Sequence, residues 1–201
     1  MSDDIPQRRL AALMFTDIVG YSALSGDNED LAIRLLHEHR KIMRRIFPLY
    51  GGIENKTIGD AFFIEFGSAI EAVRCAIDMQ TAHYERNISS PEDEQIVMRV
   101  GLHVGDVVGY EGDSFGSGVN IAARVEAQAP AGGIGLTRDV FEQVKSHSLA
   151  TFKRMGVKRF KNIKEPIEVY RVIFPWEIRK KSDYKQWPGR IADNIVPFLY
   201  S

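Results

Sequence analysis

The order of strand-like and helix-like segments in this chain predicts an α+β fold built on a βαββαβ unit. Residues 10–16 (LAALMFT) form an apolar run of strand length, as expected for a strand buried on both faces of a sheet. Residues 55–66 (NKTIGDAFFIEF) place two β-rich runs on either side of Gly59-Asp60, which is a strong hairpin signal. A segment of helical periodicity on either side of this hairpin completes the unit, an antiparallel-containing sheet with helices on one face.

The first helix is expected after residues 26–30 (GDNED), where Asp27 or Asn28 is available as the N-cap. Its apolar positions recur every three or four residues, and Pro48 and Gly51-Gly52 end it. These positions are Leu31, Leu35, His39, Ile42 and Ile46.

The second helix is expected to follow the hairpin and to end in the polar loop 87–95. Its apolar face consists of Ile70, Val73, Ile77 and Tyr84. A strand over residues 97–110 comes next. The elements expected beyond it are a glycine-rich turn at 111–118, a helix at 119–129, a strand at 133–137, a helix at 138–144, and strands near 151–160 and 167–174.

With 201 residues, the chain is long enough for one globular domain with an ordinary core. We expect an N-terminal lead over residues 1–7, the domain over 8–174 and a C-terminal extension over 175–201. The extension contains Trp176 and Trp187, which predicts that it packs against the domain or contacts a partner.

Composition argues against several classes of function. The chain has 26 Lys and Arg residues against 27 Asp and Glu residues, so its net charge of −1 predicts no attraction to nucleic acid or to an anionic membrane. Cys75 is the single cysteine, which excludes a disulfide framework, and we expect it to be buried. The polar N-terminus and the lack of a long apolar run predict a cytoplasmic protein without a membrane segment.

Two aspartates are expected at the same edge of the predicted sheet. Asp17 lies at the end of the first strand and Asp60 lies at the hairpin tip. Paired carboxylates suit hard cations, above all Mg²⁺, which takes one or two protein carboxylates and completes its shell with water and substrate phosphate. The alternative is that each aspartate only supports a turn.

Asn120 and Arg124 are four residues apart in the helix predicted at 119–129, so they project from the same helix face. An amide beside a guanidinium is suited to a ribose and a phosphoryl group, because arginine can donate two hydrogen bonds to phosphate oxygens. The alternative is a solvated helix face without a ligand.

Four segments together resemble the catalytic domain of class III nucleotidyl cyclases, the adenylate and guanylate cyclases. They are FTDIVGYS (15–22), KTIGDAFF (56–63), GDSFGSGVNIAARVE (112–126) and FKNIKEPIEVYRV (160–172). The resemblance extends from about Arg8 to Ile173. It implies a ferredoxin-like core, with additional C-terminal strands and a helix, and a homodimer with two active sites at the subunit interface.

The resemblance also implies a role for particular residues. Asp17 and Asp60 would bind two Mg²⁺ or Mn²⁺ ions, with help from the backbone carbonyl of Ile18. The remaining implied roles are Lys56 and Asp113 for the purine, Asn120 for the ribose, Arg124 for the transition state, and Lys161 for the triphosphate, with Lys164 as an alternative. The metal ligands would come from one subunit, and the purine, ribose and transition-state residues from the other.

The implied reaction is the conversion of ATP into 3′,5′-cyclic AMP and pyrophosphate. Lys56 with Asp113 favours adenine over guanine, and neither a metal aspartate nor Arg124 has been lost. The alternatives are a catalytically silent nucleotide-sensing or dimerisation module, a guanylate cyclase, and a dinucleotide cyclase of related fold. A regulatory domain or partner would act outside these motifs.

The short segment DVVGYEG (106–112) predicts weak, concentration-dependent dimerisation.

Overall fold

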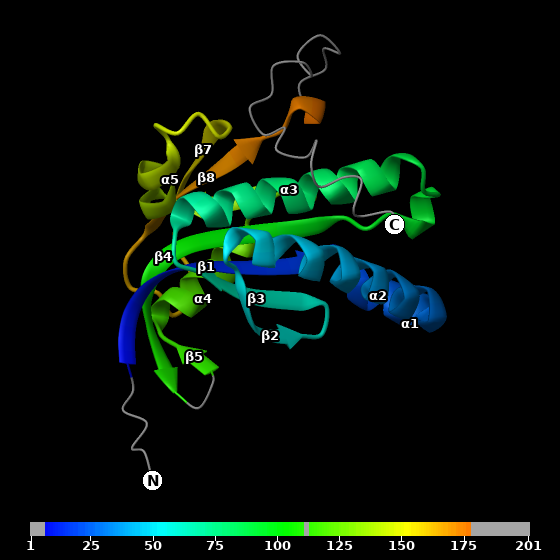
Figure 1. Ribbon diagram of the computed structural model, residues 1–201, viewed down its shortest axis with the longest axis horizontal. Helices are drawn as coiled ribbons and strands as arrows, with labels where there is room; N and C mark the ends of the chain where they lie inside the picture. The colour runs from blue at the N-terminus through cyan, green and yellow to red at the C-terminus, as the bar shows by residue number, and fades with distance from the viewer. Residues whose placement is uncertain (1–6, 111–112, 178–201) are drawn as a thin grey trace.

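The computed structural model describes residues 7–110 and 113–177. The predicted N-terminal lead therefore lies outside the described residues except for Gln7, and so does the C-terminal extension after Glu177. Within the described ranges, an eight-stranded sheet has the order β2-β3-β1-β4-β6-β8-β7, with β5 paired to β4 (Figure 1). The strands are β1 (Gln7–Ile18), β2 (Ile53–Ile58), β3 (Ala61–Phe66), β4 (Met98–Tyr110), β5 (Asp113–Phe115), β6 (Ile134–Thr137), β7 (Thr151–Lys158) and β8 (Ile167–Ile173).

Only β4 and β6 pair in parallel among the described strands, and the other pairs are antiparallel. The α-helices are α1 (Tyr21–Asp27), α2 (Glu29–Ile46), α3 (Ala69–Ile88), α4 (Ser117–Glu126) and α5 (Arg138–Val144). Short 3₁₀ helices lie at η1 (Phe47–Tyr50), η2 (Glu92–Glu94) and η3 (Pro175–Glu177). The α+β fold and its βαββαβ order are confirmed.

Local signals placed the two long helices correctly. The side chain of Asn28 caps α2, because its Oδ1 accepts a hydrogen bond from the backbone N–H of Leu31 at 3.1 Å. Helix α1 was not predicted. Tyr21 and Leu24 pack against a small core cluster that contains Ile18, Leu35 and Ile96, so tertiary contacts stabilise a segment whose sequence alone gives a weak helix signal.

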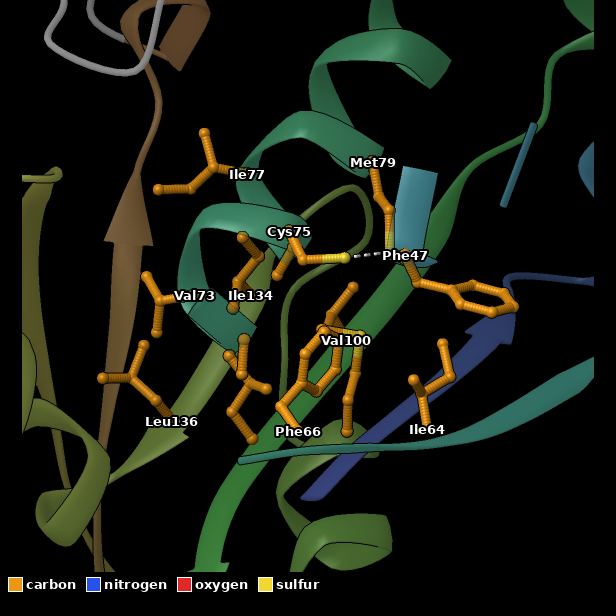
Figure 2. Packing of buried hydrophobic residues seen from close by; sticks show 14 of the residues in the cluster. Phe47, Ile64, Phe66, Val73, Cys75, Ile77, Met79, Val100, Ile134 and Leu136 are labelled. Carbon is orange, nitrogen blue, oxygen red and sulfur yellow. Dashed lines mark hydrogen bonds between the residues drawn. The ribbon is translucent and has the colours of Figure 1, made fainter. Parts of the chain in front are cut away.

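The main core lies between the sheet and helices α2 and α3, which run across it side by side (Figure 1). Figure 2 shows Phe66, Val100 and Ile134 from the sheet facing Val73 and Cys75 of α3. Cys75 is completely buried, as predicted, with its Sγ 3.9 Å from Sδ of Met79.

Helix α4 packs on the opposite face of the sheet, against β1 and β4. Its Ala122 joins a smaller cluster with Leu13 and Phe63, whose side chains alternate with those of the main core. The two helices of the βαββαβ unit, α2 and α3, thus share one face as expected, and α4, which follows that unit in the chain, covers the other face. Gly101 allows this second layer, because a Cβ there would lie 2.1 Å from the backbone nitrogen of Glu126.

The described part of the C-terminal extension packs against the domain. The ring of Trp176 stacks on Tyr84 with centroids 4.2 Å apart and on Phe174 with centroids 4.4 Å apart. Among the described residues, the longest helices are too polar or too short to span a bilayer.

Candidate active site

Asp17 and Asp60 meet at one edge of the sheet. Strand β1 pairs with β3 through Thr16 and Phe62, so Asp17 lies beside the β2–β3 turn that carries Asp60. Gly59 provides the left-handed conformation of this turn, with φ of 63°. The backbone N–H of Ile18 then donates a hydrogen bond of 2.8 Å to Oδ2 of Asp60. The structure therefore brings the two predicted carboxylates together.

Arg99 lies at the same edge and was missed by the sequence analysis. It is paired with Asp17 across β1 and β4, and its Nη2 donates to Oδ2 of Asp17 at 2.5 Å. Its Nε lies 3.0 Å from Oε1 of Glu126, the last residue of α4. A charged residue within the apolar stretch VMRVGL was the available signal, but its partner lies 82 positions away in the sequence.

The edge carries more negative than positive charge. Burial raises the pKa of Asp60, the hydrogen bond from Ile18 opposes this shift, and the charge of Asp17 raises the pKa further. Burial also raises the pKa of Glu126 to about 7, against the lowering effect of Arg99. Three carboxyl groups thus surround one guanidinium group, and when they are all ionised a cation at this edge would relieve their repulsion.

The donor set suits a divalent cation with a partly open shell. Within residues 7–110 and 113–177, no group of three or more His, Cys, Asp or Glu side chains is arranged to hold a metal ion. Asp17 and Asp60 would supply hard oxygen ligands, and water or substrate phosphate would supply the others, as is usual for Mg²⁺. The residues therefore fit the ion expected from the sequence.

Asn120 and Arg124 are both exposed on α4, one turn apart as predicted. The other side of the helix, which includes Ala122 and Val125, is buried against the sheet. Among the described residues, no hydrogen bond or ion pair joins Asn120 or Arg124 to the two aspartates. Within one chain, these two side chains face solvent.

The two predicted purine residues lie on strands that approach each other from different hairpins. Lys56 belongs to β2, and its Nζ lies 5.9 Å from the ring centroid of Phe115 on β5. Asp113 is the first residue of β5 and pairs with Tyr110 of β4. Only the backbone of Asp113 is described. Strand β5 also lies against β2, so the backbones that carry Lys56 and Asp113 are neighbours.

Lys161 and Lys164 lie at the opposite end of the sheet from Asp17. Both are exposed in the loop between β7 and β8, whose last ladder pair is Lys158 with Ile167. Strand β8 is antiparallel to β6, and β6 is parallel to β4, which begins beside Asp17. The start of β8 is therefore remote from the carboxylate edge, and the structure does not bring either lysine to it.

His103 has a structural environment. It lies in β4 with 7% of its surface exposed, and its Nδ1 is 3.1 Å from Oγ1 of Thr137. Burial lowers its pKa, so the ring stays neutral at physiological pH.

Comparisons with known proteins cover almost all of the predicted domain. Residues 5–173 match the family model described as "Adenylate and Guanylate cyclase catalytic domain". The chain is 36% identical over 171 residues to "Putative adenylate cyclase 3" of Rhizobium meliloti, covering 85% of this chain and 29% of that protein. The chain thus spans less than a third of that relative's length.

Solved structures show the same fold. The "Adenylate/Guanylate Cyclase/Hydrolase" from Silicibacter pomeroyi superposes with a TM-score of 0.79 at 35% identity, covering 84% of this chain and 99% of that one. The adenylyl cyclase CyaB from P. aeruginosa superposes with a TM-score of 0.72 at 24% identity, covering 84% of this chain and 96% of that one. At the latter identity, the likeness is one of fold alone.

Proposed function

Because the chain belongs to the adenylate and guanylate cyclase catalytic domain family, we propose that it converts ATP into 3′,5′-cyclic AMP and pyrophosphate. The choice of ATP over GTP rests on Lys56 and Asp113. A lysine donor and a carboxylate acceptor match the ring nitrogen and exocyclic amine of adenine, whereas guanine presents the reverse pattern at these positions.

Asp17 and Asp60, with the carbonyl of Ile18, would hold two Mg²⁺ or Mn²⁺ ions. When bound, the ions would make the ribose 3′-hydroxyl more acidic and offset the charge of the triphosphate. The ion pair between Arg99 and Asp17 already occupies one carboxylate oxygen at 2.5 Å. Metal binding would therefore compete with Arg99 for Asp17.

Two further side chains, those of Asn120 and Arg124, would bind and orient the nucleotide. Asn120 would hold the ribose so that its 3′-oxygen attacks the α-phosphate in line, while the bond to pyrophosphate breaks. Arg124 would face the charge that develops on the α-phosphate, a role worth about 10³–10⁵ in rate for an arginine finger. The proton of the 3′-hydroxyl leaves to solvent or substrate oxygen, so no side chain is needed as a base.

A single observation supports a site shared between two copies of the chain. Asp17 and Asp60 lie at one end of the sheet, whereas Lys161 lies beyond the opposite end and Arg124 faces solvent. One copy is therefore incomplete, and a symmetric homodimer would form two complete sites because an isologous interface repeats each contact twice.

Complementation tests this shared site. Asp17→Ala and Arg124→Ala should each be inactive alone. An equal mixture should restore about a quarter of wild-type cyclic AMP formation, because about half of the dimers are then mixed and each of these contains one intact site of two. Mixing Asp17→Ala with Asp60→Ala is the matched control, since both changes damage the same half. No recovery in the first mixture, or recovery in the second, would contradict the shared site.

Turnover of ATP and GTP with Mg²⁺ and with Mn²⁺, over a range of protein concentrations, tests the substrate and the reaction. We expect cyclic AMP formation whose specific rate rises with protein concentration. Preferred turnover of GTP would identify a guanylate cyclase instead. Absence of turnover with either nucleotide would identify a catalytically silent module.

A further inference from the structure

Strand β2 contains a β-bulge beside Lys56. Glu54 pairs with Ile64 and Lys56 pairs with Phe63, so the register shifts at Asn55. In a regular strand, neighbouring side chains point to opposite faces of the sheet. The bulge instead lets Asn55 and Lys56 both reach the face that carries Phe63 and Glu65. Bulges often redirect a side chain in this way near active sites.

Asn55 is the centre of a polar network that crosses four strands. Its Nδ2 donates hydrogen bonds to Oε1 of Glu65 on β3 and, at 3.3 Å, to Oγ of Ser114 on β5. The other carboxylate oxygen of Glu65 accepts from Nη2 of Arg9 on β1. Glu65 is only 3% exposed and Ser114 only 4% exposed. Buried polar groups that are satisfied by one another rigidify their surroundings.

The network joins two strands that the backbone ladder does not join. Among the described strands, β5 forms ladder hydrogen bonds with β4 alone. The contacts shown between β2 and β5 involve side chains, namely Asn55 with Ser114 and Lys56 with Phe115. Each partner of the first contact is the sequence neighbour of a proposed purine residue, since Asn55 precedes Lys56 and Ser114 follows Asp113.

We propose that Asn55, Glu65 and Ser114 position Lys56 and Asp113 relative to each other and thereby set the discrimination between adenine and guanine. This inference rests on the proposed cyclase function. Asn55, Glu65 and Ser114 are positioning residues, because they act through their neighbours rather than by touching the nucleotide. Arg9 holds Glu65 in place from β1, so the network is anchored to the central strands of the sheet.

The test compares kcat and KM for ATP and GTP in Ser114→Ala, Ser114→Thr and Asn55→Ala. Loss of one hydrogen bond in Ser114→Ala should lower the ATP to GTP ratio of kcat/KM by about five- to tenfold. The change should appear as a higher KM for ATP, with kcat within about twofold of wild type, because the proposed metal ligands and Arg124 are untouched. Ser114→Thr keeps the hydroxyl and should restore the ratio. Ser146→Ala, an exposed change after α5, is the control for serine removal.

Asn55→Ala should lower the ratio at least as much, and adding Ser114→Ala to it should have no further effect, because the shared hydrogen bond is already lost. An equal loss of turnover with both nucleotides would indicate a merely structural role and would overturn the proposal. An unchanged ratio in Ser114→Ala, where Lys56→Ala alters it, would refute the positioning network and leave the cyclase function standing. If Asn55→Ala fails to fold, the two Ser114 variants decide the question.

Discussion

On the face of the sheet covered by α2 and α3, side chains such as Met14, Phe62 and Ile64 are completely buried and pack into one continuous cluster. On the α4 face, the apolar cluster is small, and charged or polar groups including Asp17, Arg99 and Glu65 lie along the same strands. The side of the sheet covered by α2 and α3 therefore supplies most of the apolar burial that stabilises the fold. The α4 side can then carry several charged groups, because the main core offsets the free energy that their repulsion costs.

The largest expected effect is on activity at the α4 face. Asp60→Asn should lower cyclic AMP formation by about 10³-fold, because one proposed metal ligand loses its charge. Its thermal stability without metal should be unchanged or higher, since burial and Asp17 raise the pKa of Asp60 and the substitution removes that repulsion. Paired activity and thermal unfolding measurements check both parts. A strongly destabilised variant would mean that Asp60 is chiefly structural.

The next effect is on stability at the opposite face. Phe66 is 2% exposed in the main core, and Phe66→Ala should lower the free energy of unfolding by about 3–5 kcal/mol. The matched change is Phe115→Ala in β5, where the ring is 52% exposed, and it should cost less than about 1 kcal/mol. Denaturant titration of both variants measures the difference. Equal losses would show that burial of the Phe66 ring in the main core adds nothing to stability.

A smaller effect is expected where α4 meets the sheet. Gly101→Ala would place a Cβ 2.1 Å from the backbone nitrogen of Glu126, so α4 must move. We expect a loss of about 1–3 kcal/mol in stability. Activity should fall as well, because α4 carries Asn120 and Arg124. Gly109→Ala, in the same strand but with open space around the added Cβ, serves as the control and should be nearly neutral in both measurements.

The smallest effect concerns pH. The pKa of Glu126 is raised by burial to about 7 from an ordinary value of 4.5, so its protonated form favours folding. The stability that this carboxyl group contributes is fully present below pH 4.5 and is lost as the pH rises through 7. Glu126→Gln should therefore flatten this decline by about 1–2 kcal/mol in metal-free protein. Urea unfolding between pH 4.5 and 8 measures how the free energy of unfolding falls with pH. Glu142→Gln, at an exposed position, is the control and should leave this decline in place. A decline that persists in Glu126→Gln would assign it to other groups.

The strands other than β5, the two long helices and the β2–β3 hairpin could be predicted from the sequence. Their signals are local, such as the Asn28 cap, the Gly59-Asp60 turn and the spacing of Val73 and Ile77. The meeting of Asp17 and Asp60 at one edge also followed, because a hairpin that pairs with the first strand leaves few other positions for its tip. Short elements such as α1 and β5 were not predicted, because packing rather than propensity stabilises them.

The contacts between residues that are far apart in the sequence depended on the tertiary structure. Periodicity indicates which residues share a face of a helix, but it does not indicate which face of the sheet the helix covers. Helix α4 covers the face opposite α2 and α3, where Gly101 admits its close approach. Arg99 and Asp17 are 82 positions apart in the sequence, and the register of β1 against β4 brings them together. The bulge in β2 directs the side chain of Asn55 toward Ser114. The chemical groups and the local elements that carry them thus follow from the sequence. The fold decided which groups meet, because register and close packing depend on the whole sheet rather than on neighbouring residues.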